Sequence, residues 1–138
     1  MKKLIYSFSF FFLLIFSSLW AQDSSIEARK LLNQYEAALR SKSLDKIAQC
    51  FHPECRILPE GSLPVDGHAG VKGVFEELQT LDFEENFTIK EAIPMGDMVY
   101  IHTWNEGISE NPATRERSKF SYKGQMILKK DSTASWKI

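Results

Sequence analysis

The stretch CFHPECRILPEG, Cys50 to Gly61, brings two cysteines, a histidine, two acids and an arginine into twelve residues. Such a set could form a disulfide, bind a metal or supply acid–base groups, or simply turn a helix into a strand. A cysteine pair at zinc spacing needs a second ligand pair elsewhere in the chain, and the sequence offers none, so we expect no metal. Cys50 and Cys55 are either bridged or separately buried, and the sequence leaves both readings open.

A second group of candidate residues alternates along the segment 98–108. Aliphatic side chains suit a strand face that packs against helices, whereas a mixed aromatic and polar face suits a ligand pocket. A histidine there would have an ordinary pKa of about 6.5 and could be neutral and basic near pH 7. One face holds Val99, Ile101 and Thr103, and the other, mixed face holds Tyr100, His102, Trp104 and Glu106.

Helices occupy the first half of the sequence, and strands follow. Apolar residues recur at helical spacing over 25–42, 43–52 and 67–81, and Ser43 is a candidate cap of the second helix. After Leu81 the period changes to two, which predicts strands. Their expected ranges are 83–93, 98–108, 115–130 and 135–138, after a short strand over 55–58. This order indicates an α+β fold with helices on one face of a curved sheet.

Residues 1–21 predict an export leader. Lys2 and Lys3 precede an uncharged run rich in Phe and Leu, and Ala21 offers a small residue at the cut. The run is shorter than the roughly 20 residues that span a membrane, so we expect a secreted or periplasmic protein without a membrane anchor. Residues 22–138 then form a single domain. No basic stripe carries interleaved aromatic residues, so nucleic acid is not an expected partner.

Two stretches show a resemblance to a known superfamily: NQYEAALRSKSLDKIAQCFHPECRILPEG and GHAGVKGVFEEL. A tyrosine in the first helix, a Leu-Asp pair opening the second, a phenylalanine before the first strand and a glycine before the third helix follow its pattern. From about Leu31 onward, the chain resembles the nuclear transport factor 2-like superfamily, which includes ketosteroid isomerase and the SnoaL-like cyclases. The resemblance implies a cystatin-like α+β cone, in which three N-terminal helices pack on a curved antiparallel sheet.

The same resemblance suggests roles for individual residues. Tyr35 falls where the isomerases keep the tyrosine that donates to the developing oxyanion, and Phe75 falls on an apolar wall. The positions of the two catalytic acids carry Pro59, with Glu60 beside it, and Gly124. A general base commonly contributes about 100- to 10,000-fold to rate, so the resemblance does not imply standard isomerase activity.

The sequence therefore predicts a secreted domain that binds a small apolar or amphipathic molecule. One alternative is an isomerase, dehydratase or cyclase without metal or cofactor, in which Tyr35 acts with His102 or Glu60. Another is an assembly module, because the open sheet of this superfamily commonly supports homodimers. The predicted ligand-binding residues are Tyr35, Phe75, Tyr100, His102, Trp104 and Met126.

Overall fold

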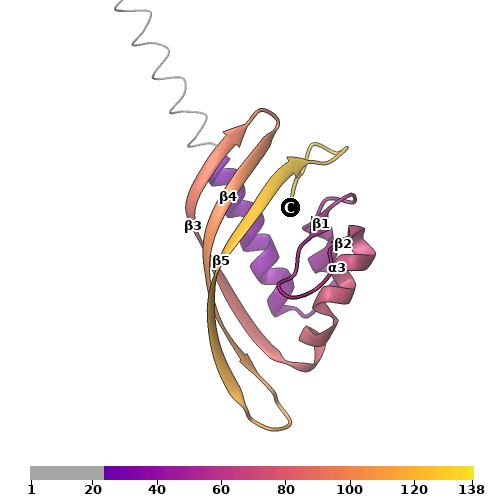
Figure 1. Cartoon of the computed structure of the whole chain (residues 1–138), viewed down its shortest axis with the longest axis vertical. Coiled ribbons are helices and arrows are strands. Elements are labelled where there is room, and N and C mark those ends of the chain that lie inside the picture. Colours follow the sequence, from indigo (N-terminus) through magenta and orange to yellow (C-terminus); the bar gives the residue numbers. More distant parts are fainter. Residues whose placement is uncertain (1–23) are drawn as a thin grey trace, which may run out of the picture.

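A computed structural model describes residues 24–138 of the chain (Figure 1). The predicted leader, residues 1–21, lies outside the described residues, and export stays a prediction. The first helix spans residues 24–40 of the described part, α2 spans Leu44–Gln49 and α3 spans Gly67–Phe75. A 3₁₀ turn, η1 (Glu76–Thr80), continues α3, so the third predicted helix changes type before Leu81. In residues 24–138 no helix is both long and apolar enough to cross a membrane.

The helices form where their apolar stripes and caps predict. The Ser43 hydroxyl accepts a hydrogen bond from the Lys46 N–H at 3.4 Å and caps α2, as the sequence indicated. The first helix buries one face through residues spaced three and four apart. Those residues are Ala28, Leu31, Leu32, Tyr35, Ala38 and Leu39.

Antiparallel strands make up the second half of the described chain. The strands β3 (Asp82–Met95), β4 (Met98–Glu110), β5 (Arg117–Lys130) and β6 (Trp136–Lys137) form one sheet in that order. The short strands β1 (Arg56–Ile57) and β2 (Val65–Asp66) pair separately. The α+β architecture predicted from the sequence is therefore confirmed.

The long sheet curls, and all the helices lie on its concave side (Figure 1). The register of β3 against β4 shifts between Ile89 and Glu91, and such a bulge bends a strand and increases its twist. The first helix runs along the sheet. The elements α3, β1 and β2 form a lobe, and the C-terminus lies between this lobe and the sheet (Figure 1).

The first helix is tied to β3 at the edge of the sheet. Glu36 Oε1 accepts hydrogen bonds from the Phe87 N–H at 2.9 Å and from Arg29 Nη2 at 2.7 Å. Arg29 Nη1 donates to the carbonyl of the same Phe87. One ion pair therefore occupies both backbone hydrogen-bonding groups of Phe87 that face away from β4.

Register decides which side chains face the helices. Residues paired across strands share a face, so the concave side carries rows such as Phe87–Asn105–Tyr122 and Ile89–Thr103–Gly124. On β4 the concave residues are fully or almost fully buried, with Ile101, Thr103 and Asn105 each 0% exposed. The concave face of β4 is Val99, Ile101, Thr103 and Asn105.

The predicted inward orientation of Tyr100, His102 and Trp104 is therefore wrong. These residues alternate with the buried ones and lie on the outer face, each only partly buried. The sequence-based prediction assigned one face of β4 to packing against the helices and the opposite face to a ligand pocket. Only one face of this sheet is covered, so the helix contacts and any interior hollow must share it.

Candidate functional site

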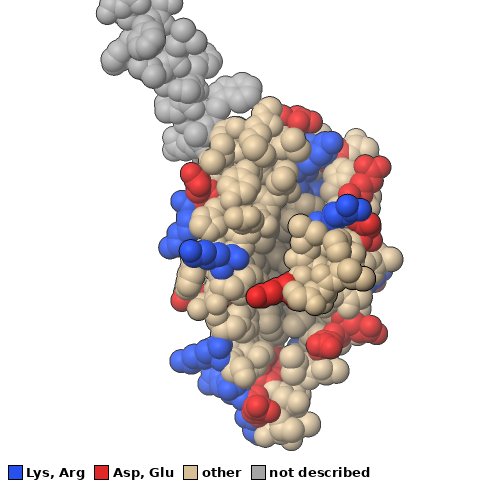
Figure 2. Space-filling model, in the orientation of Figure 1, with Lys and Arg blue, Asp and Glu red and all other residues tan. Residues whose placement is uncertain are grey.

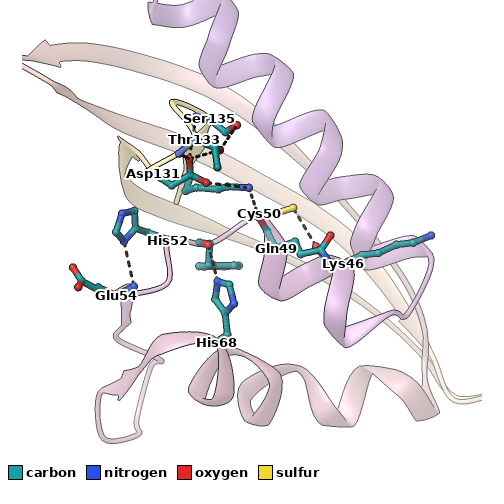
Figure 3. Close-up of polar contacts among 11 residues, drawn as sticks. Lys46, Gln49, Cys50, His52, Glu54, His68, Asp131, Thr133 and Ser135 are labelled. Carbon is teal, nitrogen blue, oxygen red and sulfur yellow. Dashed lines mark hydrogen bonds and ion pairs between the residues drawn. The ribbon is translucent and has the colours of Figure 1, made fainter.

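The corner Cys50–Gly61 is held by contacts that serve the fold (Figure 3). The His52 N–H donates to the Ile138 carbonyl at 2.7 Å, and the Ile138 N–H donates to the Cys50 carbonyl at 2.9 Å. His68 Nε2 donates to the Phe51 carbonyl at 2.9 Å, and His52 Nδ1 accepts from the Glu54 N–H at 3.2 Å. The polar groups of this corner thus join α2, α3 and the C-terminal strand.

Cys50 and Cys55 are free thiols in the structure. Burial raises the pKa of both, so neither is activated as a thiolate nucleophile. Within residues 24–138, no three histidine, cysteine or acidic side chains lie together in a way that could hold a metal ion.

Of the six predicted binding residues, Tyr35, Phe75 and Met126 lie on the covered side of the sheet. Tyr35 is 5% exposed, and its ring centroid lies 5.5 Å from that of Phe51, 6.2 Å from Phe75 and 5.2 Å from Phe87. Met126 pairs with Ile101 and is partly buried against the core. The structure does not bring His102 to Tyr35, and Glu60 is exposed in the loop between β1 and β2.

The structure adds a buried carboxyl group that sequence reasoning missed. Glu85 on β3 is 4% exposed, and its Oε1 accepts a hydrogen bond from the Tyr122 hydroxyl on β5. Glu85 pairs with Gly107 on β4, and Tyr122 pairs with Asn105, so this hydrogen bond crosses the intervening strand. Glu85 and Tyr122 therefore form a pair that spans the concave face.

Burial perturbs the titration of this pair. Desolvation raises the pKa of Glu85 to about 7, the Tyr122 hydrogen bond opposes that shift, and the charge of Glu36 adds to it. Burial first, and then the charge and hydrogen bond of Glu85, raise the pKa of Tyr122. The Asn105 amide lies close enough to the Tyr122 hydroxyl to lower this pKa, but the two groups do not meet the geometry of a hydrogen bond. The pKa of Tyr35 is raised by burial and then by the charge of Glu85. A carboxyl that is half ionised near pH 7 thus lies among neutral phenols.

Two further polar side chains on β4 lie beside this pair without partners. Thr103 Oγ1 and both polar atoms of the Asn105 amide are buried, and none makes a hydrogen bond within the described chain. A Cβ added at Gly124 would lie 2.5 Å from Thr103 Oγ1 and 2.9 Å from Asn105 Nδ2, so only glycine leaves them this room. Buried polar groups are almost always paired, and an exception calls for an explanation such as a bound molecule.

A sequence signal for these residues did exist. Glu85 stands between Phe83 and Phe87 at the period of a strand, and Asn105 continues the alternation of Ile101 and Thr103. A polar residue at an otherwise apolar period-two position marks a buried polar group. The sequence-based prediction assigned the pocket to the opposite face of β4 because that face carries aromatic residues.

Replacing Asn105 by Leu should stabilise the protein without ligand. An unpaired buried amide costs about 1–3 kcal/mol, and leucine has the same branched arrangement of heavy atoms without polar atoms. We expect the free energy of unfolding in urea to rise by roughly this amount. Asn86→Leu is the matched control on the exposed side of β3 and should change stability by less than about 0.5 kcal/mol. Destabilisation by Asn105→Leu alone would show that the amide has a partner.

A hollow opens beside the concave side of the sheet. Figure 2 shows this face of the molecule recessed between the sheet and the lobe that carries β1, β2 and α3, with mostly uncharged atoms along it. An apolar recess with a few converging polar groups is the usual form of a small-molecule site.

Comparison with known proteins gives one family match. A model of the SnoaL-like domain matches residues 32–130. No curated protein matches the sequence.

Many solved structures share the fold. A conserved protein from Planctomyces limnophilus has a TM-score of 0.75 at 14% identity, over 84% of this chain and 91% of that one. A ketosteroid isomerase-like protein from Erwinia carotovora atroseptica has a TM-score of 0.68 at 20% identity, over 79% and 85%. ActVI-ORFA from Streptomyces coelicolor has a TM-score of 0.70 at 10% identity, over 82% and 90%. At these identities the likeness concerns the fold alone.

Proposed function

The chain belongs to the SnoaL-like domain family, and from this premise we propose that it binds a small, largely apolar molecule on the concave side of its sheet. The observation that carries the proposal is the pair of buried side chains Thr103 and Asn105, whose polar atoms have no partner among the described residues. Leaving them unpaired costs stability, and a ligand or water that pairs them recovers it.

Apolar and polar groups divide the proposed site. Tyr35, Phe75 and Met126, predicted from the sequence, supply the apolar wall together with Phe87. Thr103 and Asn105, with the neighbouring pair Glu85 and Tyr122, supply the polar end. The arrangement of an apolar wall with few polar groups favours a molecule whose bulk is apolar.

Methyl NMR tests this proposal directly. The ¹³C methyl signal of Met126 should shift when a sterol, a polyketide or an aromatic compound binds, because Met126 lies on the concave side. Met95 is the internal control, since it is 40% exposed at the end of β3. The same compounds should raise the melting temperature by mass action. If no compound in the panel moves the Met126 signal, small-molecule binding at this site is refuted.

Acid–base catalysis is a second candidate function, favoured by Glu85. A general base works best with a pKa near the operating pH, and burial raises the pKa of Glu85 to about 7. The Glu85 carboxylate would take a proton from carbon next to a carbonyl, and the electron pair would move to the carbonyl oxygen, near the Asn105 amide. Deuterium incorporation into the methyl group of 2-acetonaphthone in D₂O, lost in Glu85→Gln, would support this role; equal rates would exclude it for this ketone.

The homodimer expected from the resemblance has a candidate surface on the outer face of the sheet. Ile93, Tyr100 and Ile127 form one row there, with Ile93 42% and Ile127 53% exposed. His102 and Trp104 lie on the same face. Such an apolar band on a sheet is a typical protein–protein contact.

Ile127→Glu should therefore give a monomer where the natural protein is a dimer, because two charges would be buried without partners. Sedimentation velocity at 10–100 μM measures this. Lys129→Glu is the control, since Lys129 lies two residues along β5 and pairs with Met98 at the end of β4. A natural protein that sediments as a monomer at every concentration would remove the dimer.

A further inference from the structure

We propose that the polar end of the ligand site, formed by Thr103, Asn105, Glu85 and Tyr122, takes an uncharged group in which a carbonyl oxygen adjoins an N–H or O–H. A carboxamide or a hydroxyketone has this pattern. The assignment rests on the proposed function, because it names the ligand chemistry of the same concave site.

The unpartnered atoms offer both donors and an acceptor. Thr103 and Asn105 stand two residues apart on β4, on one face, and both lean toward the same point beside Gly124. The Asn105 amide can donate through Nδ2 and accept through Oδ1, and the Thr103 hydroxyl can do either. A ligand group that only accepts leaves Oδ1 unpaired, and a hydrocarbon leaves every atom unpaired. A group that accepts and donates side by side satisfies the set.

Tyr122 covers this subsite. It is the cross-strand neighbour of Asn105, and its hydroxyl reaches Glu85 on the far strand. The polar atoms of Asn105 are buried, but the Tyr122 residue is 46% exposed. A ligand group that reaches Asn105 would therefore displace the Tyr122 side chain, which its exposure to solvent allows.

The surrounding charges disfavour an anionic ligand. Glu85 on β3 and Glu36 on the first helix are close enough for Glu36 to raise the pKa of Glu85, and the phenols Tyr35 and Tyr122 complete the polar surroundings. The charge of Arg29 is balanced by Glu36, at 2.7 Å, and its Nη1 donates to the Phe87 carbonyl, while its buried Nε has no partner among the described residues. A carboxylate or phosphate would lose its hydration next to acidic groups, and the nearby cation, Arg29, is already neutralised by Glu36.

Two matched probe series test the subsite on the full chain at pH 8. Each series contains a hydrocarbon, a carboxamide and a carboxylate of nearly equal shape: toluene, benzamide and benzoate, and 2-methylnaphthalene, 2-naphthamide and 2-naphthoate. Titration followed by the Met126 methyl signal gives each dissociation constant. In at least one series we expect the amide to bind tenfold or more tightly than both analogues. That preference should disappear in Asn105→Leu and in the isosteric Thr103→Val, and persist in Asn86→Leu.

The outcomes separate the two proposals. Binding of all three analogues with similar affinity, or a preference that survives in both Asn105→Leu and Thr103→Val, overturns the subsite but leaves small-molecule binding standing. Tighter binding of the carboxylate overturns the subsite in the same way. Failure of all six probes to shift the Met126 methyl signal counts against both the subsite and the proposed function. Circular dichroism of each variant checks that it is folded before titration.

Discussion

Replacing Glu85 by Gln should raise the free energy of unfolding by about 3 kcal/mol at pH 8.5 and by almost nothing at pH 4. The pKa of Glu85 is raised from 4.5 to about 7 in the folded protein, so the folded state holds its proton more tightly than the unfolded state. Stability contributed by this proton is present below pH 4.5 and is lost as the pH rises through 7. Glutamine keeps the shape and a hydrogen bond to Tyr122 without that loss.

Urea unfolding at half-unit steps from pH 4 to pH 8.5 measures this effect. At each pH, the free energy of unfolding of the natural protein is subtracted from that of Glu85→Gln. The contributions of groups that titrate identically in both proteins cancel in this difference. Glu84→Gln is the matched control, because Glu84 neighbours Glu85 but is exposed. Its difference curve should be flat. A flat curve for Glu85→Gln as well would mean that the carboxyl is solvated and not buried.

Gly107→Ala should have the largest destabilising effect among the glycine substitutions. A Cβ at Gly107 would lie 2.3 Å from the Glu84 carbonyl oxygen and 2.3 Å from the Phe120 ring, which stacks on Phe83 with centroids 5.3 Å apart. The backbone oxygen cannot move without breaking the pairing of β3 with β4. We expect a loss at or above the upper end of the roughly 1–3 kcal/mol typical of overpacking.

Gly73→Ala is the matched control for that substitution. Gly73 lies in α3, and nothing lies within 4 Å of a Cβ added there. Alanine in a helix is favoured over glycine by roughly 0.5–1 kcal/mol, so this variant should gain stability. Urea denaturation of both variants measures the two changes in the free energy of unfolding, which should be negative for Gly107→Ala and positive for Gly73→Ala. An equal, small effect at both positions would show that the sheet adjusts at Gly107.

Much of the architecture could be predicted from the sequence because local signals agree with it. Ser43 caps α2 as expected, and the change of period after Leu81 coincides with the start of β3 at Asp82. The end of the third helix was less predictable, because residues 76–80 keep the apolar spacing but adopt a tighter turn. The predicted start of β5 was Arg115, whereas the strand begins at Arg117. Arg115 takes a left-handed conformation (φ 63°) in the hairpin loop.

The candidate site was harder to predict, because a strand pattern gives two faces and does not say which is covered. The alternation along β4 was correct, but the covered face carries Asn105 and not His102. Tyr35 and Phe75 lie on the covered side of the sheet, because the helices that carry them face it, and their role in binding stays a prediction. The pair Glu85 and Tyr122 lies on strands separated by β4, and sequence spacing carries no information on that contact.

The ion pair of Arg29 and Glu36 on Phe87 has a consequence for how copies of this protein meet. An edge strand with free N–H and C=O groups is a template on which another chain can add a strand, and unchecked addition leads to aggregates. At Phe87 those groups are already taken by the first helix. The first helix therefore blocks the addition of another strand at Phe87, near the middle of the edge strand β3. Copies of the protein can still associate through the outer face of the sheet without extending it.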